Sequence, residues 1–284
     1  MPELPEVETV RRGLAPHLVG ARLTRVIARR PDLRFPFPDG FVQRLTGARV
    51  ESLGRRGKYI LAPLDRGDTL TIHLGMSGRI QVLATDVPPA GEPVAHVATK
   101  HAHVVFETDR GATLTYFDPR RFGYMDLIET ARIEAHPRFS GMGPEPLGPD
   151  FTAAWLGAVF ADRRQSAKTL LLDQTLVAGL GNIYVCEALH AARISPLGSA
   201  GDIPRRQVAA LTDAIRKVLE AAIEAGGSTL RDYANVEGGM GYFQHAFQVY
   251  GREGEACPRK RCAGVVQRLQ QGGRSTFFCP KCQT

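Results

Sequence analysis

Residues 58–76, KYILAPLDRGDTLTIHLGM, predict a β-hairpin, because two apolar runs flank the turn sequence DRGD at 65–68. Residues 103–117, HVVFETDRGATLTYF, repeat the pattern around a turn at 108–111. From residue 21 to about residue 127 the chain consists of short β-rich runs with turns at similar spacing, which is typical of a sandwich or barrel. The Pro/Gly-rich stretch VPPAGEP at 87–93 predicts an exposed loop.

Helices are expected on both sides of this β-rich region. Before it, the apolar residues at positions 4, 7, 10, 14 and 18 recur on one helical face. After it, GMGPEPLGPD at 141–150 predicts a linker, because closely spaced Pro and Gly cannot hold regular structure. Beyond the linker, helices are predicted over 151–164, 182–194 and 204–227, the last beginning at Pro204 and ending at Gly226 and Gly227.

These patterns predict a multidomain α+β protein. A β-sandwich with a flanking helix is expected over 1–135, a helical domain over 150–245, and a small cysteine-bearing β-hairpin domain over 248–284. The chain has 284 residues, of which 43% are hydrophobic and 23% charged, an ordinary globular composition that can bury a sizeable core.

The charge of the chain favours an anionic partner. The formal net charge is +7 and the isoelectric point about 9.4. Much of the excess lies in residues 251–284, where seven Lys or Arg face only two Glu. A basic region of this kind is typical of a surface that contacts a phosphate backbone.

The sequence gives no sign of a membrane partner. No apolar run reaches the length of a membrane span, and the N-terminal stretch is too acidic and too poor in leucine for a signal peptide. We therefore expect the protein to stay in the compartment where it is made, the cytoplasm.

Four cysteines near the end of the chain predict a zinc site. Four residues separate Cys257 from Cys262, two separate Cys279 from Cys282, and sixteen lie between the pairs. A Gln-Gln-Gly-Gly turn between the apolar runs VVQRL and STFF completes the pattern of a zinc ribbon, a β-hairpin closed at its base by one structural Zn²⁺. So small a segment takes its folding energy from the metal, on the order of 10 kcal/mol. The alternative is a pair of disulfides. The fifth cysteine, Cys186, is expected to be a buried core thiol.

Five motifs occur in a fixed order along the chain: PELPEVETV at the start, HLGMSG at 73–78, DPRRFG at 118–123, GLGNIY at 179–184 and GRSTFFCPKCQ near the end. With the cysteine pairs, they closely resemble the formamidopyrimidine-DNA glycosylase family over essentially the whole chain. The resemblance implies an N-terminal β-sandwich, a helix–two-turns–helix domain and a zinc finger. It implies an enzyme, acting as a monomer on damaged double-stranded DNA, that removes 8-oxoguanine and formamidopyrimidines and then cuts the abasic strand. One departure is the first cysteine pair, which has four intervening residues where many members have two.

The second residue fits covalent chemistry. Once Met1 is removed, Pro2 presents a secondary amine that can attack C1′ of the sugar and leave a cationic iminium, which acidifies the neighbouring C2′ hydrogen. The pKa of an α-amino group is roughly two to three units below that of lysine, so a neutral fraction exists near pH 7. The alternative reading is structural, since an early proline followed by acidic residues is a common way to begin a helix.

The resemblance assigns further catalytic roles. Glu3 matches the family's general acid/base, and Glu6 on the same helix matches a residue that faces the base pocket. Lys58, in RRGKYI, matches the lysine that assists base release and the first elimination. Arg274, in GRSTFF, matches the arginine of the final δ-elimination, which also clamps phosphate.

Other positions match DNA contacts of the family. Met76, Arg120 and Phe122 resemble the wedge that fills the gap left by an extruded nucleotide, and Arg120 would offer donors to the orphaned cytosine. Asn182 lies at a predicted helix N-terminus, which favours a phosphate. Arg164, Lys168 and His101 also match contacts. The glycine-rich residues 226–243 match a loop that closes over the everted purine.

Two other functions remain open. Endonuclease VIII shares the implied fold and the Pro nucleophile but removes oxidised pyrimidines; PELPEVETVRRGL and the long segment at 226–243 favour the purine enzyme. A zinc-ribbon DNA-binding protein without catalysis would have no use for a Pro2 amine.

Overall fold

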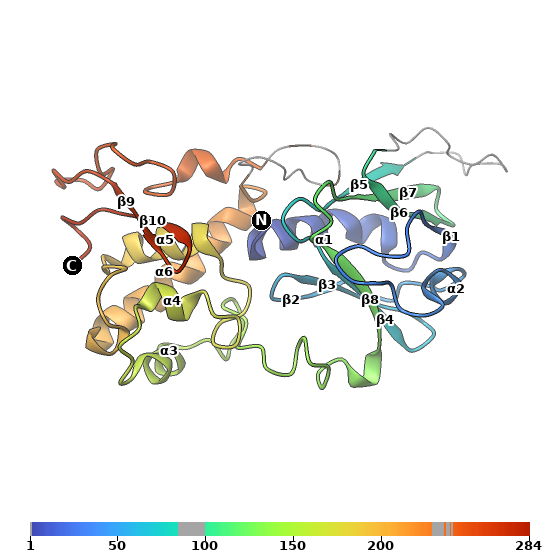
Figure 1. Ribbon diagram of the computed structural model, residues 1–284, viewed down its shortest axis with the longest axis horizontal. Helices are drawn as coiled ribbons and strands as arrows, with labels where there is room; N and C mark the ends of the chain where they lie inside the picture. The colour runs from blue at the N-terminus through green and yellow to red at the C-terminus, as the bar shows by residue number, and fades with distance from the viewer. Residues whose placement is uncertain (1, 85–99, 229–235, 237–238, 240) are drawn as a thin grey trace. The chain divides into compact units, whose positions relative to one another are not determined.

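The computed structural model describes residues 2–84, 100–228, 236, 239 and 241–284 (Figure 1). The expected loop at 87–93 and most of the expected loop at 226–243 therefore lie outside the described residues. The chain divides into two compact units. Unit 1 comprises Met1–Ser140 and Ala225–Tyr242, and unit 2 comprises Gly141–Glu224 and Phe243–Thr284.

Unit 1 contains two four-stranded sheets, as the strand pattern predicts. The first has the order β1-β6-β7-β5 and the second β2-β3-β4-β8. The strands are β1 (Leu23–Ala28), β2 (Gly54–Arg56), β3 (Tyr59–Pro63), β4 (Asp68–His73), β5 (Arg79–Ala84), β6 (Ala102–Thr108), β7 (Ala112–Phe117) and β8 (Tyr124–Glu129). Both predicted hairpins are confirmed, since β3 pairs with β4 and β6 pairs with β7, each antiparallel.

Helix α1 (Leu4–Leu18) contacts strands of both sheets, β2 and β3 of one and β5 of the other (Figure 1). Its apolar face, which includes Val7, Val10 and Leu14, joins the same core as Leu23, Ile60 and Leu114 of the strands. Short elements complete unit 1, namely α2 (Phe41–Leu45) and the 3₁₀ turn η1 (Thr130–Arg132). Because one face of α1 is buried in this core, the N-terminal motif PELPEVETV is held in a fixed position against the two sheets.

Unit 2 is helical with one hairpin. Its elements are α3 (Ala153–Phe160), α4 (Ala167–Leu171), α5 (Asn182–Ala192), η2 (Ala200–Asp202), α6 (Arg205–Glu224), η3 (Phe243–Ala246), β9 (Gln267–Gln271) and β10 (Arg274–Phe278). Three of the helices lie where the sequence predicts them, and residues 141–150 form no helix or strand, as expected of a linker. Helix α5 packs against α6 and against β10 (Figure 1). In the described parts of the chain, no helix is both long and apolar enough to cross a membrane.

Residues 225–242 follow the helices in sequence and group with unit 1 by their contacts. They belong to unit 1, because Ser228 donates two hydrogen bonds to Glu6 and the Val82 backbone N–H donates to the Val236 carbonyl at 2.8 Å. Gly13 of α1 makes room for this segment, since a Cβ there would lie 2.5 Å from Cγ2 of Val236. The domain boundaries drawn from the sequence stay a prediction.

Candidate functional site

The start of α1 is buried and tied to a distant segment. Pro2, Glu3 and Glu6 are all buried. The Glu3 backbone N–H donates to Oε2 of Glu6 at 2.9 Å, and Oε1 of Glu6 accepts from the backbone N–H and the hydroxyl of Ser228 at 2.8 and 3.0 Å. Both oxygens of Glu6 are therefore engaged, which fixes the first turn of the helix beside Pro2.

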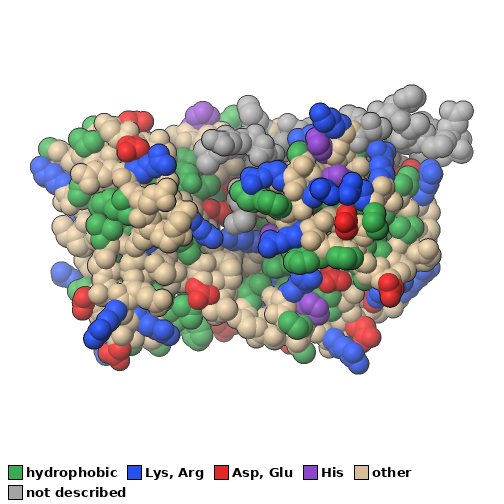
Figure 2. Space-filling view, viewed as in Figure 1, with side chains coloured by type: hydrophobic (Ala, Val, Ile, Leu, Met, Phe, Trp, Pro, Cys, Tyr) green, Lys and Arg blue, Asp and Glu red, His purple; other side chains and the backbone are tan. Residues whose placement is uncertain are grey.

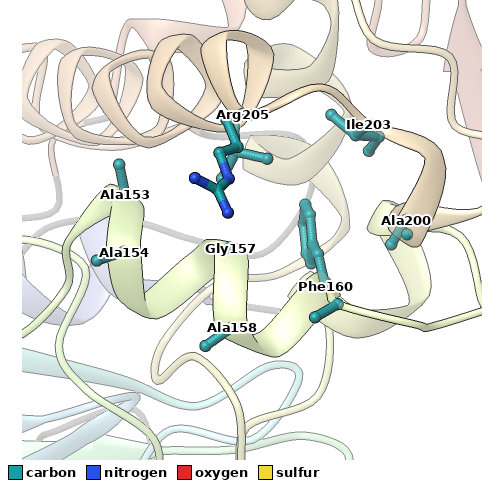
Figure 3. Close-up of a pocket in the computed structure, with 11 residues that line it drawn as sticks. Ala153, Ala154, Gly157, Ala158, Phe160, Ala200, Ile203 and Arg205 are labelled. Atoms are coloured by element: carbon teal, nitrogen blue, oxygen red, sulfur yellow. The ribbon is translucent and has the colours of Figure 1, made fainter.

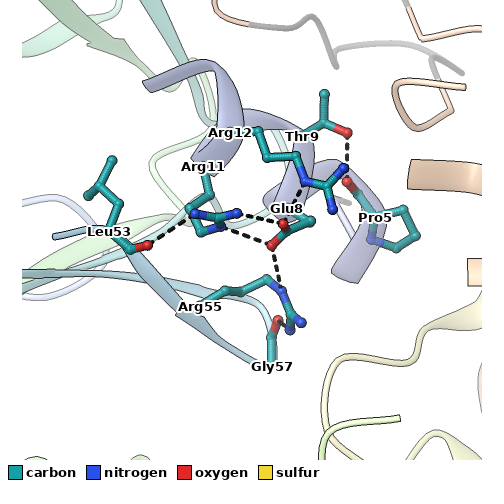
Figure 4. Close-up of polar contacts among 8 residues, drawn as sticks. All are labelled: Pro5, Glu8, Thr9, Arg11, Arg12, Leu53, Arg55 and Gly57. Atoms are coloured by element: carbon teal, nitrogen blue, oxygen red, sulfur yellow. Dashed lines mark hydrogen bonds and ion pairs between the residues drawn. The ribbon is translucent and has the colours of Figure 1, made fainter. Parts of the chain in front are cut away.

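One turn further, Glu8 anchors α1 to the second sheet (Figure 4). Its carboxylate accepts from Arg11 at 2.8 and 3.0 Å, from Arg12 at 2.8 Å and from Arg55 of β2 at 3.2 Å. Burial alone would raise the pKa of Glu8, but the hydrogen bonds from Arg11 and Arg12 and the charges of Arg11 and Arg55 lower it to about 2. Sequence reasoning missed this cluster, because Arg55 is far from Glu8 along the chain.

Lys58 lies in the tight turn between β2 and β3, where Arg56 pairs with Tyr59. Its side chain is only 8% exposed, although lysines are rarely buried. Gly57, the residue before it, has a φ of 55°, a value that glycine tolerates and that this turn requires. The fold thus holds an amine at a fixed place in unit 1.

The HLGMSG and DPRRFG motifs form two neighbouring loops that present large side chains to solvent. Met76 is 37% and Phe122 42% exposed, and the Arg120 guanidinium carbon lies 4.8 Å from the centre of the Phe122 ring. The three side chains also line one pocket of about 550 Å³, together with Leu33, Arg34, His73, Gly75 and Arg121. The structure therefore brings together the three residues that the resemblance named as a wedge.

Two other groups lie at this end of unit 1. His73, in the pocket wall, has its pKa lowered to about 4 by burial and by the positive charges of Lys58, Arg34 and Arg138, so it is neutral at pH 7. His101 is half-buried with a φ of 70°, and its carbonyl accepts a hydrogen bond from the Asp118 backbone N–H at 3.0 Å. Over this face of unit 1, Lys and Arg side chains alternate with hydrophobic ones (Figure 2). Such a mixture suits contact with both phosphates and bases.

In unit 2, Lys168 and Asn182 meet at the ribbon hairpin. The Lys168 amine donates to the Ser275 carbonyl at 3.2 Å and to the Thr276 hydroxyl at 2.6 Å, while the Asn182 amide donates to the same carbonyl at 2.8 Å. Lys168 is 1% exposed, and burial, followed by the charge of Arg274, lowers its pKa. The contacts of Lys168 attach β10 to α4, and the contact of Asn182 attaches it to α5. Arg274 and Arg164 are exposed.

The four cysteines form a cluster that fits zinc. Their sulfur atoms all lie within 4.8 Å of one another, with Cys257 and Cys282 at 3.8 Å and Cys262 and Cys279 at 3.7 Å. A tetrahedral zinc with bonds of about 2.3 Å to sulfur separates its ligands by roughly 3.8 Å, so the donor set matches. The turn between β9 and β10 has Gly272 and Gly273 at φ 56° and 73°. Cys186 is 1% exposed among apolar side chains, which confirms the expected core thiol.

The ribbon is also bound to the C-terminal end of α5. Arg259 donates to the carbonyls of His190 and Ala191, and Gln283 donates to the Ile194 carbonyl at 2.9 Å. The Nε2 atom of His190 lies 3.4 Å from the Cys257 sulfur. These contacts join the zinc site to the helix whose first residue is Asn182, a link the sequence did not reveal.

A larger pocket, of about 630 Å³, lies elsewhere in unit 2 between α3, η2 and α6 (Figure 3). Small side chains such as Ala153, Gly157 and Ala158 line it, and Arg205 extends from the start of α6 toward α3. No residue singled out in the sequence lines this pocket, so size alone does not mark the functional site.

Three models of known protein families match successive segments of the chain. Residues 1–125 match the model of the formamidopyrimidine-DNA glycosylase N-terminal domain and residues 142–234 that of its H2TH domain. Residues 254–284 match the model of a zinc finger found in FPG and IleRS.

Relatives match over the whole chain. The formamidopyrimidine-DNA glycosylases of Caulobacter vibrioides and Phenylobacterium zucineum are 63% and 61% identical to it, with 100% of each chain covered. Among solved structures, a Lactococcus lactis FPG mutant in complex with a Fapy-dG containing DNA is similar, with a TM-score of 0.86, 36% identity and 100% coverage of both chains. The MutM (FPG) protein of Thermus thermophilus has a TM-score of 0.84 and 39% identity, with 99% of this chain and 98% of that one covered. With its two sheets, helical unit and four-cysteine ribbon, the chain belongs to the formamidopyrimidine-DNA glycosylase family.

Proposed function

We propose that this DNA glycosylase excises oxidised purines, 8-oxoguanine and formamidopyrimidines, from duplex DNA and cuts the abasic strand through a covalent bond to Pro2. Family membership supports the substrate class, as do the solved relatives bound to Fapy-dG DNA and to abasic-site DNA. The observation that supports the mechanism is the buried first turn of α1, in which Glu3 follows Pro2 and its backbone N–H donates to Glu6.

The reaction begins when removal of Met1 exposes the Pro2 amine. Its nitrogen attacks C1′, the N-glycosidic bond breaks, and the base leaves with a proton. The sugar ring then opens at the C1′–O4′ bond, with a proton delivered to O4′, and leaves an iminium between C1′ and Pro2. The iminium acidifies the C2′ hydrogen, so that base-catalysed elimination expels the 3′-phosphate and a second elimination expels the 5′-phosphate. The pKa of an α-amino group is about 8, so part of the Pro2 amine is neutral and nucleophilic at pH 7.

The neighbouring carboxylates divide the remaining work. Both oxygens of Glu6 accept hydrogen bonds, which assigns it to holding the helix start and Ser228. Glu3 follows the nucleophile directly in the chain and is proposed to move protons on the deoxyribose; its carboxylate also accepts the Glu6 backbone N–H. Lys58, held in the β2–β3 turn, assists base release and the first elimination. Arg274, exposed on the ribbon of unit 2, acts at the last phosphate.

DNA binding follows from the surface residues. Met76 and Phe122 fill the space of the extruded nucleotide, and Arg120 offers donors to the unpaired cytosine. Asn182, Arg164 and His101 hold phosphates. Lys168, whose amine is buried, supports Asn182 through the Ser275 carbonyl to which both side chains donate. Because affinity then depends on several phosphate contacts, the association constant should fall by orders of magnitude between about 50 and 200 mM salt.

Reductive trapping tests the mechanism. Borohydride added to the protein with an 8-oxoguanine:cytosine duplex should yield a cross-link, and peptide mapping should locate it at Pro2. A chain extended by several residues ahead of Pro2 has an amide in place of the amine and should give no cross-link. A Pro5→Ala chain alters the helix start without touching the amine, and it should still be trapped. A cross-link that maps to a lysine, or an extended chain with full activity, contradicts the role of Pro2.

The substrate is tested separately, with duplexes that carry an oxidised purine or an oxidised pyrimidine. Faster processing of the pyrimidine duplex would replace the proposed substrate class while leaving the Pro2 chemistry intact.

A further inference from the structure

The two loops that carry Met76, Arg120 and Phe122 cross between the sheets side by side. Residues 74–78 lead from β4 of the second sheet to β5 of the first, and residues 118–123 lead from β7 of the first sheet back to β8 of the second. The register aligns them at both ends, because His73 pairs with Tyr124 and Arg79 pairs with Phe117. Contacts between these two loops therefore determine the orientation of their exposed side chains.

One buried carboxylate joins them. The side chain of Asp118 is fully buried. Its Oδ1 accepts a hydrogen bond from the Ser77 hydroxyl at 2.6 Å, and its Oδ2 accepts from the Gly123 backbone N–H at 2.8 Å and from the Tyr116 hydroxyl at 3.3 Å. Asp118 thus contacts the first loop through Ser77 and both ends of its own loop.

Ser77 connects Asp118 to Arg120. The Ser77 hydroxyl gives its single proton to Asp118 and, through a lone pair, accepts the Arg120 backbone N–H at 3.2 Å. Met76 precedes Ser77 directly in the chain. The Ser77 hydroxyl therefore fixes the backbone next to Met76 in one loop and the backbone of Arg120 in the other.

The two loops approach each other so closely that neither Gly75 nor Gly123 has room for a side chain. A Cβ on Gly75 would lie 2.3 Å from both the Gly123 nitrogen and the Phe122 carbonyl carbon, and one on Gly123 would lie 1.9 Å from the Tyr116 hydroxyl. Burial, followed by the charge and the hydrogen bond of Asp118, raises the pKa of Tyr116 well above its usual value, so the hydroxyl remains a donor.

We propose that Asp118 is a positioning residue for DNA insertion: through Ser77 and Gly123 it holds Met76, Arg120 and Phe122 ready before DNA arrives. This inference rests on the proposed function, in which those three side chains fill the gap in the duplex. Side chains that are already ordered lose less entropy on binding, so preorganisation strengthens the inserted state. Asp118 itself is buried beneath the loops and touches no DNA.

Asp118→Asn is the primary test, because it keeps the volume and removes one acceptor. On an 8-oxoguanine:cytosine duplex, we expect kcat/KM to fall about 10- to 100-fold, since a lost buried acceptor shared by two loops costs one to two powers of ten. On a single-stranded abasic oligonucleotide, which needs no gap filled, borohydride trapping should proceed at nearly the wild-type rate. A merely structural defect would reduce both activities equally, and that result would overturn the inference.

A fluorescent cytosine analogue opposite an abasic-site analogue reports insertion directly. Binding of wild-type protein should change the fluorescence emission of the cytosine analogue. The Asp118→Asn variant, added at a saturating concentration, should change that emission less. Asp68→Asn is the matched control, because Asp68 lies at the opposite end of β4, where its carboxylate binds Arg44 at 2.6 and 3.0 Å. This control should lower the melting temperature and leave the emission change intact.

Further variants distinguish a failure of this inference from a failure of the proposed function. Should Asp118→Asn fail to fold, Ser77→Ala carries the test, with the same direction and a smaller effect. If Met76→Ala and Phe122→Ala reduce the emission change while Asp118→Asn and Ser77→Ala do not, the inference is wrong and the proposed function stands. If Met76→Ala and Phe122→Ala leave the signal unchanged, the proposed insertion itself is wrong.

Discussion

The β3–β4 hairpin of unit 1 and the β9–β10 hairpin of unit 2 have similar strand lengths but different surroundings. In β4 the four central residues are buried, and Leu70 and Ile72 enter a core shared with α1. In β9 no residue is buried, and only Leu269 and Gln271 are even half-buried. The first hairpin is held by apolar burial on both strands. The second buries apolar side chains only on β10, at Phe277 and Phe278, and is held as well by four thiols and by hydrogen bonds to neighbouring helices. Removing the metal should therefore disorder one and spare the other.

The largest effect is expected from Cys279→Ser, which removes a zinc ligand. The ribbon takes on the order of 10 kcal/mol of its folding free energy from the metal, so this variant should lose zinc and become susceptible to proteolysis after residue 250. Unit 1 should melt as in the wild type. Cys186→Ala, which removes a buried thiol outside the cluster, should keep one zinc per chain. Full zinc content in Cys279→Ser would mean that the ribbon does not depend on this ligand.

The converse change is Leu114→Ala in the core of unit 1. Leu114 is 1% exposed, and deleting most of its side chain leaves a cavity that should destabilise unit 1 by about 2–5 kcal/mol. Chemical denaturation followed on unit 1 measures the loss, while zinc content should be unchanged. Leu83→Ala on neighbouring β5 is the control, since Leu83 is 45% exposed. Zinc loss in step with unfolding would show that the two hairpins are not stabilised independently.

Glu8→Gln sharpens the comparison by testing the charged anchor of unit 1. Because the pKa of Glu8 is lowered to about 2 in the folded state, its ionised form stabilises the fold above about pH 4.5 and loses that effect as the pH falls toward 2. At pH 7 the substitution should cost about 1–3 kcal/mol of unfolding free energy. The gap between variant and wild type should narrow in denaturation curves recorded from pH 5 down to pH 2. Glu129→Gln, from the exposed pair with Arg132, should have little effect at any pH.

The smallest effect is expected from Lys168→Met, which keeps the bulk of the side chain and deletes its two hydrogen bonds to β10. Losing these hydrogen bonds should lower the free energy of unfolding of the ribbon by about 1 kcal/mol. The loss is no larger because the variant no longer has to bury a charged amine. Zinc release to a chelator should then be roughly fivefold faster. Arg164→Ala, an exposed change nearby, should leave zinc release unaltered and reduce the salt dependence of DNA binding by about one phosphate contact. If Lys168→Met changes only the salt dependence, its main role is phosphate binding.

Local signals in the sequence were sufficient for most elements. The DRGD turn between apolar runs predicted β3 and β4, and the spacing of Cys257, Cys262, Cys279 and Cys282 predicted a cluster whose sulfur atoms do lie together. Helix α4, with five residues, is too short for a periodic pattern to reveal it. Periodicity and turn chemistry act over a few residues, so they predict elements better than contacts between them.

Long-range contacts were the part that could not be predicted. Ser77 and Asp118 are 41 residues apart, and Glu6 and Ser228 are 222 apart, so no local pattern links either pair. Lys168 was expected at phosphate, and the structure instead shows its amine buried against β10, a matter of tertiary packing. The motifs HLGMSG and DPRRFG nonetheless contain the residues of the two loops that lie together, and DPRRFG begins with Asp118 itself.

The bond between Glu6 and Ser228 bears on how the protein is made. A ribosome releases residues 141–224 before residue 228, so the first turn of α1 waits through the synthesis of most of unit 2 for its hydrogen-bond donors. Until then Oε1 of Glu6 needs water in place of Ser228, because a buried polar atom that has lost its hydrogen-bond donors is costly. The first turn of α1, which is synthesised first, therefore gains its last hydrogen bonds only after the helices of unit 2 have been synthesised.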